Sequence, residues 1–328
     1  MRIFVTGATG FIGTALCNEL VQHGNIIHAL YRNDNKVKCL NHKNIIPIKG
    51  DILDKQSIKN ALKDCEQVYH TAAFTDVWTG NNKLIYDLNV AGTINVFDAA
   101  LEAGIKRVVF TSTAGVIGPS TNNTVDENTQ QTTGFFLEYE RTKAIAEDIC
   151  KEYIKKGLSV VIVNPTRVYG PGWLNKSNSV TIMIRSYIKG KWRIIPGNGK
   201  SIGNYVFIND VVSGHIMAMN KGIAGERYIL GGENTSFTAF FKTLDRVSGK
   251  HRLMIRLPLF FMLFIAYTVI IFAKITGVKP FITPSHVKKY NYNWDISSAK
   301  AVSQLGYSIT ALKEGMEKTI NWLIQSNH

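Results

Sequence analysis

Short apolar runs alternate with stretches of helical periodicity through the first half of the chain. Six runs rich in Val, Ile, Phe and Tyr predict strands at residues 3–6, 26–31, 45–49, 67–71, 107–112 and 159–164. Between them, apolar residues spaced three or four positions apart predict helices at residues 11–23, 57–63, 84–103 and 137–156. This alternation predicts parallel strands with right-handed crossovers, and hence an α/β fold with a doubly wound parallel sheet.

The alternation breaks up after Pro165, where two glycine- and proline-rich turns follow at residues 170–172 and 196–199. Residues 209–221 predict a helix, and residues 227–230 predict a short strand that returns to the main sheet. We therefore expect a sheet domain made of residues 1–166 plus about 204–232. Residues 167–203 and 233–328 are expected to form a smaller, interleaved C-terminal lobe that binds the substrate.

The turn between the first strand and the first helix has three regularly spaced glycines. They are Gly7, Gly10 and Gly13, within the segment TGATGFIG. The first glycine permits a tight turn, the second lets a ligand approach the backbone, and the third lets helix and strand pack closely. A helix N-terminus also presents amide donors to an anion. A strand before this turn and a helix after it together predict a site for a dinucleotide pyrophosphate.

Tyr139 and Lys143 lie four residues apart, on one face of the predicted helix. Such a pair is often only a solvated helix face. It can also act as an acid/base pair, because a neighbouring positive charge favours the phenolate and lowers the pKa of the tyrosine. Hydroxyl groups at Thr111, Ser112 and Thr113 close the fifth strand, at the sheet edge where a nicotinamide would lie. Their position favours the acid/base interpretation.

Taken together, these segments resemble the extended short-chain dehydrogenases/reductases, the superfamily of NAD-dependent epimerases and dehydratases with a Rossmann fold. Within it, the chain most resembles the dihydroflavonol reductase and 3β-hydroxysteroid dehydrogenase branch. The match covers essentially the whole chain. The motifs that carry it are TGATGFIG, Asp51-Ile52, His70-Thr71-Ala72-Ala73, Asn89-Val90-Ala91-Gly92-Thr93, Thr113, Tyr139 with Lys143, Asn164-Pro165-Thr166, Gly225-Glu226-Arg227-Tyr228, and the tail from Ser298 to Tyr307.

The resemblance implies roles for four catalytic candidates. Tyr139 would be the general acid in ketone reduction and the base in the reverse direction. Lys143 would lower the pKa of that tyrosine and bind the nicotinamide ribose. Thr113 would donate a hydrogen bond to the substrate oxygen, with Ser112 as the neighbouring alternative. Asn89 would support its helix and a nearby water, or simply bond to the backbone as other buried helix residues do.

The resemblance also implies a set of cofactor-binding positions. These positions are Gly7, Thr9, Gly10, Phe11, Ile12, Gly13, Arg32, Asp51, Ile52, Thr71, Ala72, Ala73, Tyr139, Lys143 and Pro165. Asp51 would accept a hydrogen bond from the adenine amino group, although an Asp after a strand is also a common helix cap. An arginine at the end of the second strand can receive a 2′-phosphate, so Arg32 favours NADP(H). Asp34 lies close enough to keep NAD(H) open as an alternative.

Composition limits the partners. The chain has 328 residues and a formal net charge of +14, which suits cofactor phosphates or an anionic membrane surface. Nucleic acid is not expected, because no Lys/Arg cluster is interleaved with aromatic residues.

The four cysteines are scattered, and no secretory leader is recognisable, so we expect reduced thiols and a cytoplasmic protein. The histidines lack metal-ligand spacing, so no metal site is expected.

One segment, residues 257–273, is uniformly apolar and carries no charge. A helix that is apolar all round is either deeply buried or in contact with lipid. Three interpretations compete, in this order of preference: a core or lid helix of the substrate lobe, an interfacial membrane anchor, and a true membrane span. Seventeen residues are at the short limit for a span. In either favoured case, the neighbouring substrate is expected to be apolar.

The expected function is an NAD(P)H-dependent oxidoreductase that transfers hydride between the nicotinamide and a carbonyl or secondary alcohol. Nucleotide-sugar epimerases and dehydratases share the scaffold and are the alternative. Such relatives usually have an arginine shortly before the strand at 205–208, and this chain lacks it, although Arg167, Arg185 and Arg193 lie nearby in sequence. A non-catalytic cofactor sensor ranks last. The resemblance also implies a homodimer through the helices at 84–103 and 137–156.

Overall fold

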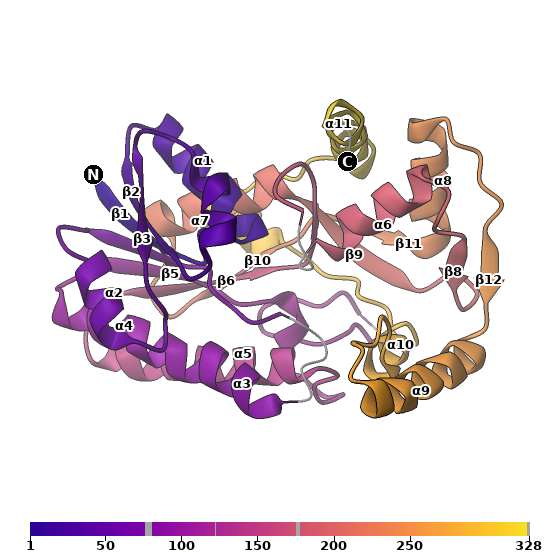
Figure 1. The fold of residues 1–328 in the computed structure, drawn as a ribbon, viewed down its shortest axis with the longest axis horizontal. Helices are drawn as coiled ribbons and strands as arrows, with labels where there is room; N and C mark the ends of the chain where they lie inside the picture. The colour runs from indigo at the N-terminus through magenta and orange to yellow at the C-terminus, as the bar shows by residue number, and fades with distance from the viewer. Residues whose placement is uncertain (76–80, 122, 175–177, 327–328) are drawn as a thin grey trace.

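The larger layer of the protein is a seven-stranded sheet in which every neighbouring pair of strands is parallel (Figure 1). The structure is a computed structural model, which describes residues 1–75, 81–121, 123–174 and 178–326. The strand order is β10-β6-β5-β4-β1-β2-β3. The strands are β1 (Arg2–Thr6), β2 (Ile26–Tyr31), β3 (Ile45–Lys49), β4 (Gln67–His70), β5 (Arg107–Thr111), β6 (Val160–Pro165) and β10 (Arg227–Leu230). The predicted parallel, doubly wound α/β fold is confirmed.

Helices cover both faces of this sheet (Figure 1). On one face lie α1 (Phe11–Gln22) and α7 (Ile208–Lys221), which contact each other. On the other face lie α2 (Lys55–Ala61), α3 (Asn82–Tyr86), α4 (Gly92–Glu102) and α5 (Glu138–Lys155). Between α3 and α4, residues Asp87–Ala91 (η2) form a π-helical turn, so the helix predicted at 84–103 is locally widened.

Side chains alternate between the two faces of each strand and divide the core in two. Ile3 and Val5 of β1 pack with α1 and α7 in one cluster, whereas Phe4 packs in the other cluster with α2, α4 and α5. Val109 and Phe110 of β5 divide in the same way. Because successive strand side chains point to opposite faces, near-continuous apolar runs such as RIFVT are what a sheet covered on both sides requires.

The remaining elements form a smaller lobe beside the carboxyl end of the sheet (Figure 1). Its strands are β7 (Arg167–Tyr169), β9 (Ile202–Phe207) and β11 (Glu233–Ser236) in one sheet, and β8 (Ile194–Pro196) with β12 (Ile255–Leu257) in another. Its helices are α6 (Ser179–Ile188), α8 (Phe237–Ser248), α9 (Leu259–Thr276), α10 (Pro284–Lys289) and α11 (Leu312–Gln325). Three short helical turns complete the described elements: η1 (Asp34–Leu40), η3 (Ala114–Val116) and η4 (Ala301–Leu305).

The two lobes are interleaved, because the chain crosses between them several times. Residues of β9 belong to the small three-stranded sheet, while α7 and β10, which follow along the chain, return to the large one. The domain boundaries drawn from the sequence remain a prediction. All four cysteines are free thiols; Cys17 and Cys150 are buried, and Cys39 and Cys65 are partly exposed.

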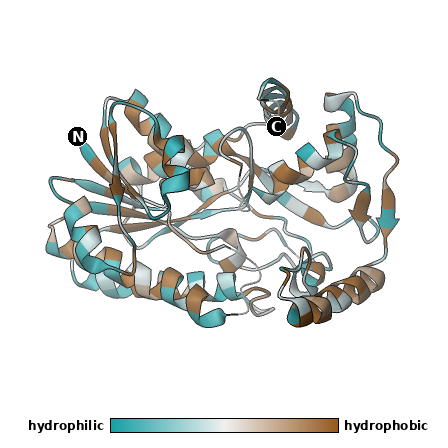
Figure 2. Cartoon of the chain, in the orientation of Figure 1, coloured by the Kyte–Doolittle hydropathy of each residue, from teal (hydrophilic) through white to brown (hydrophobic). Residues whose placement is uncertain are grey.

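The position of the apolar helix α9 rules out a core helix at residues 257–273, whereas the lid helix and the membrane anchor stay predictions. The helix lies on the surface, with only 17% of its 18-residue apolar window buried (Figures 1 and 2). Only Met262, Ala266 and Ala273 are buried along it, because a single side of the helix contacts the lobe. The sequence predicted an apolar helix correctly, but could not show how little of it the rest of the chain covers.

Gly13 is expected to be essential for packing of α1 on β1. A Cβ built at Gly13 would lie 2.1 Å from the carbonyl oxygen of Gly7, which is backbone and cannot rotate away. We expect Gly13→Ala to lower the free energy of unfolding by about 1–3 kcal/mol, the usual cost of overpacking. Urea unfolding followed by circular dichroism measures this change.

Gly24→Asn is the matched control. Gly24 has φ +75°, which Asn tolerates, and a Cβ there would meet nothing within 4 Å. An equal loss of stability in the two variants would show that the close approach at Gly13 is not what constrains the turn.

Candidate functional site

The glycine turn brings two strand ends into backbone contact. Gly7 has φ +66°, and a Cβ at this position would lie 2.6 Å from the amide nitrogen of Ala72. A side chain would therefore separate the end of β1 from the loop after β4. The sheet order changes direction between these two strands, and such a switch point is where α/β sheets bind their ligands.

The N-terminus of α1 presents unused donors at this point. The helix has Gly10 as its N-cap without a side-chain cap, and Thr14 N is the first amide to donate within the helix, to Gly10 O at 2.9 Å. The amides of Phe11, Ile12 and Gly13 precede it and point out of the helix end. Thr9 and Gly10 are partly exposed beside them. This arrangement fits a pyrophosphate group.

Thr71, Ala72 and Ala73 follow β4, on the other side of the glycine turn from α1. The hydroxyl of Thr71 donates to Thr6 O at 2.7 Å, and Ala72 N donates to the Thr6 hydroxyl at 3.2 Å. These bonds hold the loop after β4 against the end of β1. All three residues of the loop are partly exposed, so the structure places them beside the glycine turn as predicted.

His70 is a positioning residue that the sequence motif contained but did not reveal. Its ring is fully buried, with Nδ1 2.7 Å from the Thr6 hydroxyl and Nε2 3.0 Å from the Thr93 hydroxyl. Thr93 donates to Asn89 O, so its oxygen accepts from His70 Nε2–H, and the Thr6 hydroxyl donates to Nδ1. Burial and the nearby Lys143 hold the pKa of His70 well below its usual value, so the ring is neutral. The network links β1, β4 and the helical layer.

Arg32 follows β2, the neighbour of β1 in the sheet, and Asp51 follows β3, the next strand along. Arg32 Nη1 is 3.5 Å from Asp51 Oδ2, and the Arg32 side chain is 62% exposed. The other carboxylate oxygen of Asp51 accepts from Leu53 N at 3.0 Å, so Asp51 closes a turn and Asp54 is the cap of α2. Ile52 is buried against Gly92. Asp34 forms an ion pair with Lys49 at 2.7 Å.

Thr113 lies just beyond the end of β5, as the N-cap of a short 3₁₀ turn. Its hydroxyl oxygen accepts from Gly115 N at 3.2 Å, and its carbonyl accepts from Asn164 at 3.1 Å. Pro165 follows at the end of the neighbouring strand, β6, and is buried. Thr113 is partly exposed, whereas the hydroxyl of Ser112 is buried and makes no hydrogen bond with the described residues. This difference agrees with the choice of Thr113 as the residue that meets substrate.

Tyr139 lies in the first turn of α5, next to the segment that follows Thr113. A Cβ at Gly115 would lie 2.9 Å from Glu140, so the two segments are in direct contact. Burial and the charge of Glu140 raise the pKa of Tyr139 above its usual value. Lys143 is not among the causes of this shift, so the expectation that it lowers the pKa of Tyr139 stays a prediction.

Lys143, one turn further along α5, is fully buried, with Nζ 3.9 Å from the centre of the Phe110 ring. Among the described residues, Nζ has no hydrogen-bond partner. Burial lowers the pKa of Lys143 to about 7. A buried amine without acceptors is costly, so this atom indicates a site for a ligand that supplies acceptors, such as ribose hydroxyls. The residues therefore fit a nicotinamide dinucleotide.

The side chain of Asn89 connects two segments of the protein. It is 1% exposed, and its side chain accepts from Phe74 N at 2.7 Å and donates to Phe74 O and to the Thr142 hydroxyl. Asn89 thus ties the loop after β4 to α5, between Tyr139 and Lys143. Its expected support of the helix and of a nearby water stays a prediction.

A second positioning contact comes from the C-terminal lobe. Glu140 is 2% exposed and accepts from Phe136 N and Leu137 N at the start of α5, while Lys289 of α10 forms an ion pair with its other oxygen. These two partners lie 149 residues apart along the chain. The sequence offered no signal for this pair, because neither residue belongs to a recognisable motif.

Arg167 lies where the substrate lobe meets the sheet domain. Its guanidinium donates to the Tyr205 hydroxyl at 3.3 Å and lies 5.5 Å from the ring centres of Tyr205 and Phe237. A Cβ at Gly203 would lie 2.4 Å from Arg167 Nη1. The Arg167 guanidinium therefore lies beside β9. Arg167 itself belongs to β7, and not to the segment before β9 where nucleotide-sugar relatives usually have an arginine. Arg193 instead donates to a backbone carbonyl at Gly190.

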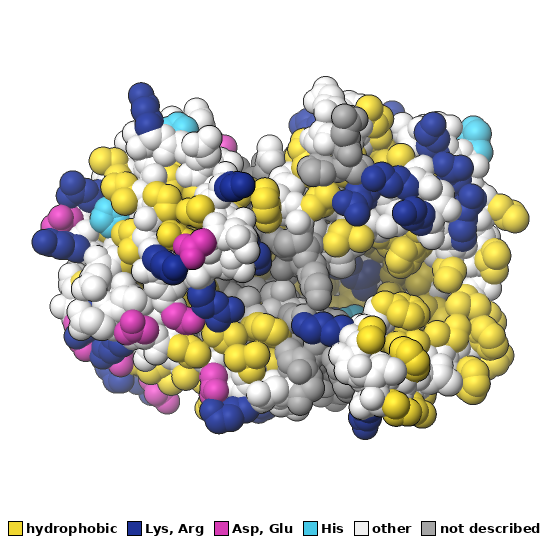
Figure 3. Space-filling view, in the orientation of Figure 1, with side chains coloured by type: hydrophobic (Ala, Val, Ile, Leu, Met, Phe, Trp, Pro, Cys, Tyr) yellow, Lys and Arg dark blue, Asp and Glu magenta, His cyan; other side chains and the backbone are white. Residues whose placement is uncertain are grey.

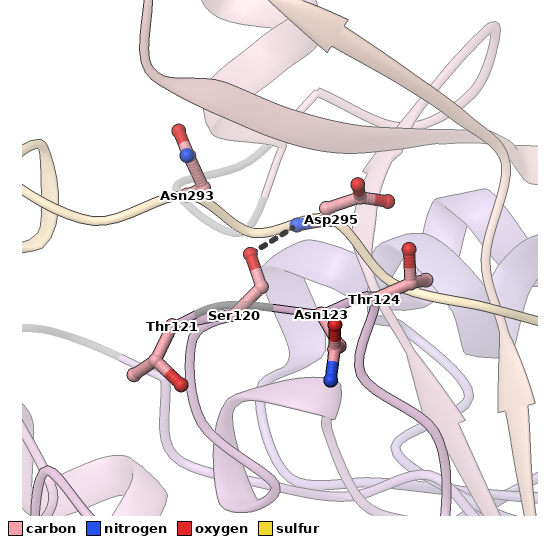
Figure 4. A pocket seen from close by; sticks show the side chains of 6 residues that line it. All are labelled: Ser120, Thr121, Asn123, Thr124, Asn293 and Asp295. Atoms are coloured by element: carbon pink, nitrogen blue, oxygen red, sulfur yellow. Dashed lines mark hydrogen bonds between the residues drawn. The ribbon is translucent and has the colours of Figure 1, made fainter.

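The structure also has a polar hollow of about 280 Å³ on its surface (Figure 4). Ser120, Thr121, Asn123, Thr124, Asn293 and Asp295 line it. Asp295 N donates to the Ser120 hydroxyl, which holds Ser120 against the C-terminal segment (Figure 4). None of the candidate residues lines this hollow. The described residues also contain no group of three or more His, Cys, Asp or Glu that could hold a metal ion.

Lys143→Met is expected to stabilise the cofactor-free protein, by about 1–4 kcal/mol, because it replaces a buried amine with an apolar chain of similar length. The wild type should also gain stability between pH 7 and about 10.5. In that interval an unfolded lysine still binds a proton that the folded Lys143, with a pKa of about 7, has released. Urea unfolding across this pH range measures both effects.

The difference in the free energy of unfolding between wild type and Lys143→Met reports on Lys143 alone, because the other titrating groups are the same in both proteins. It should shrink steadily as the pH rises from 7 to 10. A difference that stays constant with pH would mean that Lys143 keeps an ordinary pKa in the folded protein.

Comparisons with known proteins agree with this geometry. Residues 3–231 match the NAD dependent epimerase/dehydratase family. Sterol demethylase protein B of Methylococcus capsulatus is 35% identical over 263 residues, which cover 79% of this chain and 78% of that protein. A putative dihydroflavonol 4-reductase of Synechocystis is 29% identical, covering 99% of this chain and 94% of that protein.

Solved structures show the same fold. The crystal structure of gox2253 superposes with a TM-score of 0.84 at 27% identity, covering 99% of this chain and 98% of that one. UDP-glucose 4-epimerase of Thermotoga maritima superposes with a TM-score of 0.83 at 22% identity, covering 100% of both chains. The glycine turn, the strand order and the sequence match together show that the chain belongs to the NAD dependent epimerase/dehydratase family of extended short-chain dehydrogenases/reductases.

Proposed function

We propose that this protein is a cytoplasmic, NADP(H)-dependent oxidoreductase acting on the carbonyl or secondary alcohol of an apolar substrate. One observation carries the proposal. Thr113, which is partly exposed, follows β5 at the carboxyl edge of the sheet, and the first two turns of α5 carry Tyr139, with a raised pKa, and Lys143, a buried amine without a partner among the described residues. They flank a helix N-terminus suited to a dinucleotide. The bound dinucleotide supplies or accepts the hydride.

The state of Tyr139 suits donation of a proton. Because burial and Glu140 raise its pKa, the phenol stays protonated at neutral pH and can donate to the oxygen of a carbonyl as that oxygen gains charge. The Thr113 oxygen already accepts from Gly115 N, so the threonine proton is free to point at the same substrate oxygen. Two donors then stabilise one developing oxyanion.

Lys143 assists the proton transfer from Tyr139 through its charge. In the protein alone its amine is only partly charged, because burial lowers its pKa to about 7. Acceptors such as ribose hydroxyls would favour the ammonium form and would order the amine. A charged Lys143 in turn favours the phenolate that Tyr139 leaves behind. Binding of the dinucleotide would thus prepare the acid/base pair for reaction.

The relatives support an apolar substrate without identifying it. Their names include sterol demethylase protein B, dihydroflavonol 4-reductase and an Arabidopsis 3beta-hydroxysteroid-dehydrogenase/decarboxylase, which is 28% identical over 97% of this chain. We infer the same substrate class from the exposed apolar helix of the substrate lobe.

A nucleotide-sugar epimerase or dehydratase is the second candidate, and Arg167 is the observation that favours it. A guanidinium fork beside β9 suits a diphosphate. A UDP-N-acetyl-alpha-D-glucosaminuronate decarboxylase of Bacillus cytotoxicus is 32% identical over 71% of this chain. Against this candidate, the Arg167 guanidinium already donates to Tyr205 and lies near two aromatic rings.

Tyr139→Phe is expected to lower turnover by about 10²–10⁴-fold, because it removes the proton donor while leaving the ring in place. Cofactor affinity should stay within a few fold of the wild type. Tyr153→Phe is the matched control: it makes the same change in the same helix, about 21 Å further along. Steady-state rates and cofactor titration distinguish the two variants. Turnover that survives Tyr139→Phe would remove this tyrosine from the chemistry.

The exchange of cofactor separates the two candidate functions. A reductase must release its oxidised cofactor, so protein purified without additions should carry little dinucleotide after denaturation. It should then bind NADPH more tightly than NADH. Near-stoichiometric NAD(H) in the purified protein would instead indicate a cofactor recycled in place, and hence an epimerase or dehydratase.

Arg32 is the residue that we expect to set the preference for NADPH. Its exposed guanidinium pairs only loosely with Asp51, at 3.5 Å, and stays available to a 2′-phosphate. Arg32→Ala should therefore weaken NADPH binding by about 10–100-fold, the value of a charge-assisted hydrogen bond. NADH binding to the same variant is the internal control and should not change. Equal losses for both cofactors would contradict the assignment.

A further inference from the structure

Helix α9 presents a wide apolar surface to solvent. On the outward side of the helix, Phe260, Phe264, Tyr267, Ile271 and Ile275 follow one another at intervals of three or four residues, and each is between 51% and 79% exposed. We call these five residues the apolar face of α9. Phe261 and Phe272 beside it are also exposed, and Figure 3 shows the resulting hydrophobic surface. An exposed patch of this kind marks an interaction site.

The inward side of α9 is held by the protein. Met262 and Ala266 pack with Val287 of α10, and Leu259 and Ile282 border this small cluster. At the N-terminal end, Leu257 of β12 pairs with Pro196 of β8. The helix is therefore anchored along one side and at its start, and its opposite side has no cover within the described chain.

The charge of the protein is concentrated in the same lobe. Residues 167–203 and 233–328 carry 19 Lys or Arg against 5 Asp or Glu. The remaining residues carry 19 of each, so the sheet domain is neutral and the whole net charge of +14 belongs to the lobe that displays α9. Arg256, Lys274 and Lys288 are exposed around the helix, and further basic side chains lie on the same lobe, mainly above its hydrophobic surface in Figure 3.

We propose that α9 docks the protein on the surface of an anionic lipid bilayer, with the helix lying in the plane of the interface. Aromatic and aliphatic side chains enter the boundary between headgroups and acyl chains, while flanking cations contact the anionic headgroups. The proposal rests on the exposure of the helix and on the distribution of charge. It is independent of the reaction proposed above.

Two other ways to cover the apolar face of α9 fit these observations less well. A second copy of the chain would bring two lobes of strong positive charge together, which opposes association. A membrane span would have to pull Met262, Ala266 and Ala273 away from the lobe that buries them. With 18 residues, α9 is about 27 Å long, slightly short of the hydrocarbon thickness.

Docking would also bring lipid close to the candidate site. Between α9 and the start of α5 lies α10, whose Lys289 forms the ion pair with Glu140 beside Tyr139. One short helix, α10, therefore separates the apolar face of α9 from α5, which carries Tyr139. A substrate dissolved in the bilayer would reach the lobe without first crossing water.

The test is cosedimentation of the full chain with vesicles of phosphatidylcholine, either pure or containing about one third phosphatidylglycerol. We expect binding to the anionic vesicles and weak binding to the neutral ones. Phe264→Asp with Ile271→Asp should reduce binding to anionic vesicles at least ~10-fold, because charges cannot enter the acyl boundary. The matched control is Ile223→Asp with Ile324→Asp, at sites 57% and 64% exposed, against 64% and 59% in the test pair.

A second variant keeps the helix intact and tests the charge. Arg256→Gln with Lys274→Gln should lower binding to anionic vesicles several-fold and leave binding to neutral vesicles unchanged. Three results would overturn the proposal: equal binding by the test and control pairs, self-association that the test pair abolishes without any vesicle binding, or resistance of the membrane-bound protein to alkaline extraction, which would indicate a span. Melting temperatures of all variants verify that each is folded.

Discussion

The close approach between the glycine turn and the loop after β4 is the constraint on which the site depends. With φ +66° and no Cβ, Gly7 allows β1 to end against the backbone of Ala72, and Gly13 lets α1 begin directly above that turn. The first amides of α1 therefore face the crevice where the order of the sheet reverses. The Thr6, His70 and Thr93 network holds both strand ends in place from within the core. Substitution at either glycine would move two strand ends and a helix at once.

Burial shapes the chemistry of the candidate site. Tyr139 and Lys143 are four residues apart on one helix, yet burial acts on them in opposite directions: it raises the pKa of the phenol and lowers that of the amine. Both groups are thereby biased toward their neutral forms in the protein alone. Lys143 Nζ and the Ser112 hydroxyl also lack partners among the described residues. Unpaired buried groups reduce stability, and they are found where a ligand completes the set of hydrogen bonds.

The two lobes differ in electrostatic character and meet at α5. With the boundaries expected from the sequence, the sheet domain is electrically neutral, and the smaller lobe carries the whole net charge of +14. Contact between them at the start of α5 includes a partly buried ion pair, Lys289 with Glu140, and Glu140 also accepts from Phe136 N and Leu137 N. The smaller lobe thus combines the net positive charge with the exposed apolar helix α9, and it contacts the sheet domain at the start of α5.

The sequence by itself determined the parallel sheet and the glycine turn, because strand periodicity, crossover handedness and glycine geometry are local or topological rules. The strand bounds at residues 26–31, 45–49 and 227–230 are confirmed to the residue. Only the tertiary structure decided which side of α9 is covered, how Tyr139 and Lys143 are charged, and that Glu140 meets Lys289. These properties depend on desolvation and on contacts between segments up to 149 residues apart. No local pattern encodes them, because burial is a property of the assembled chain.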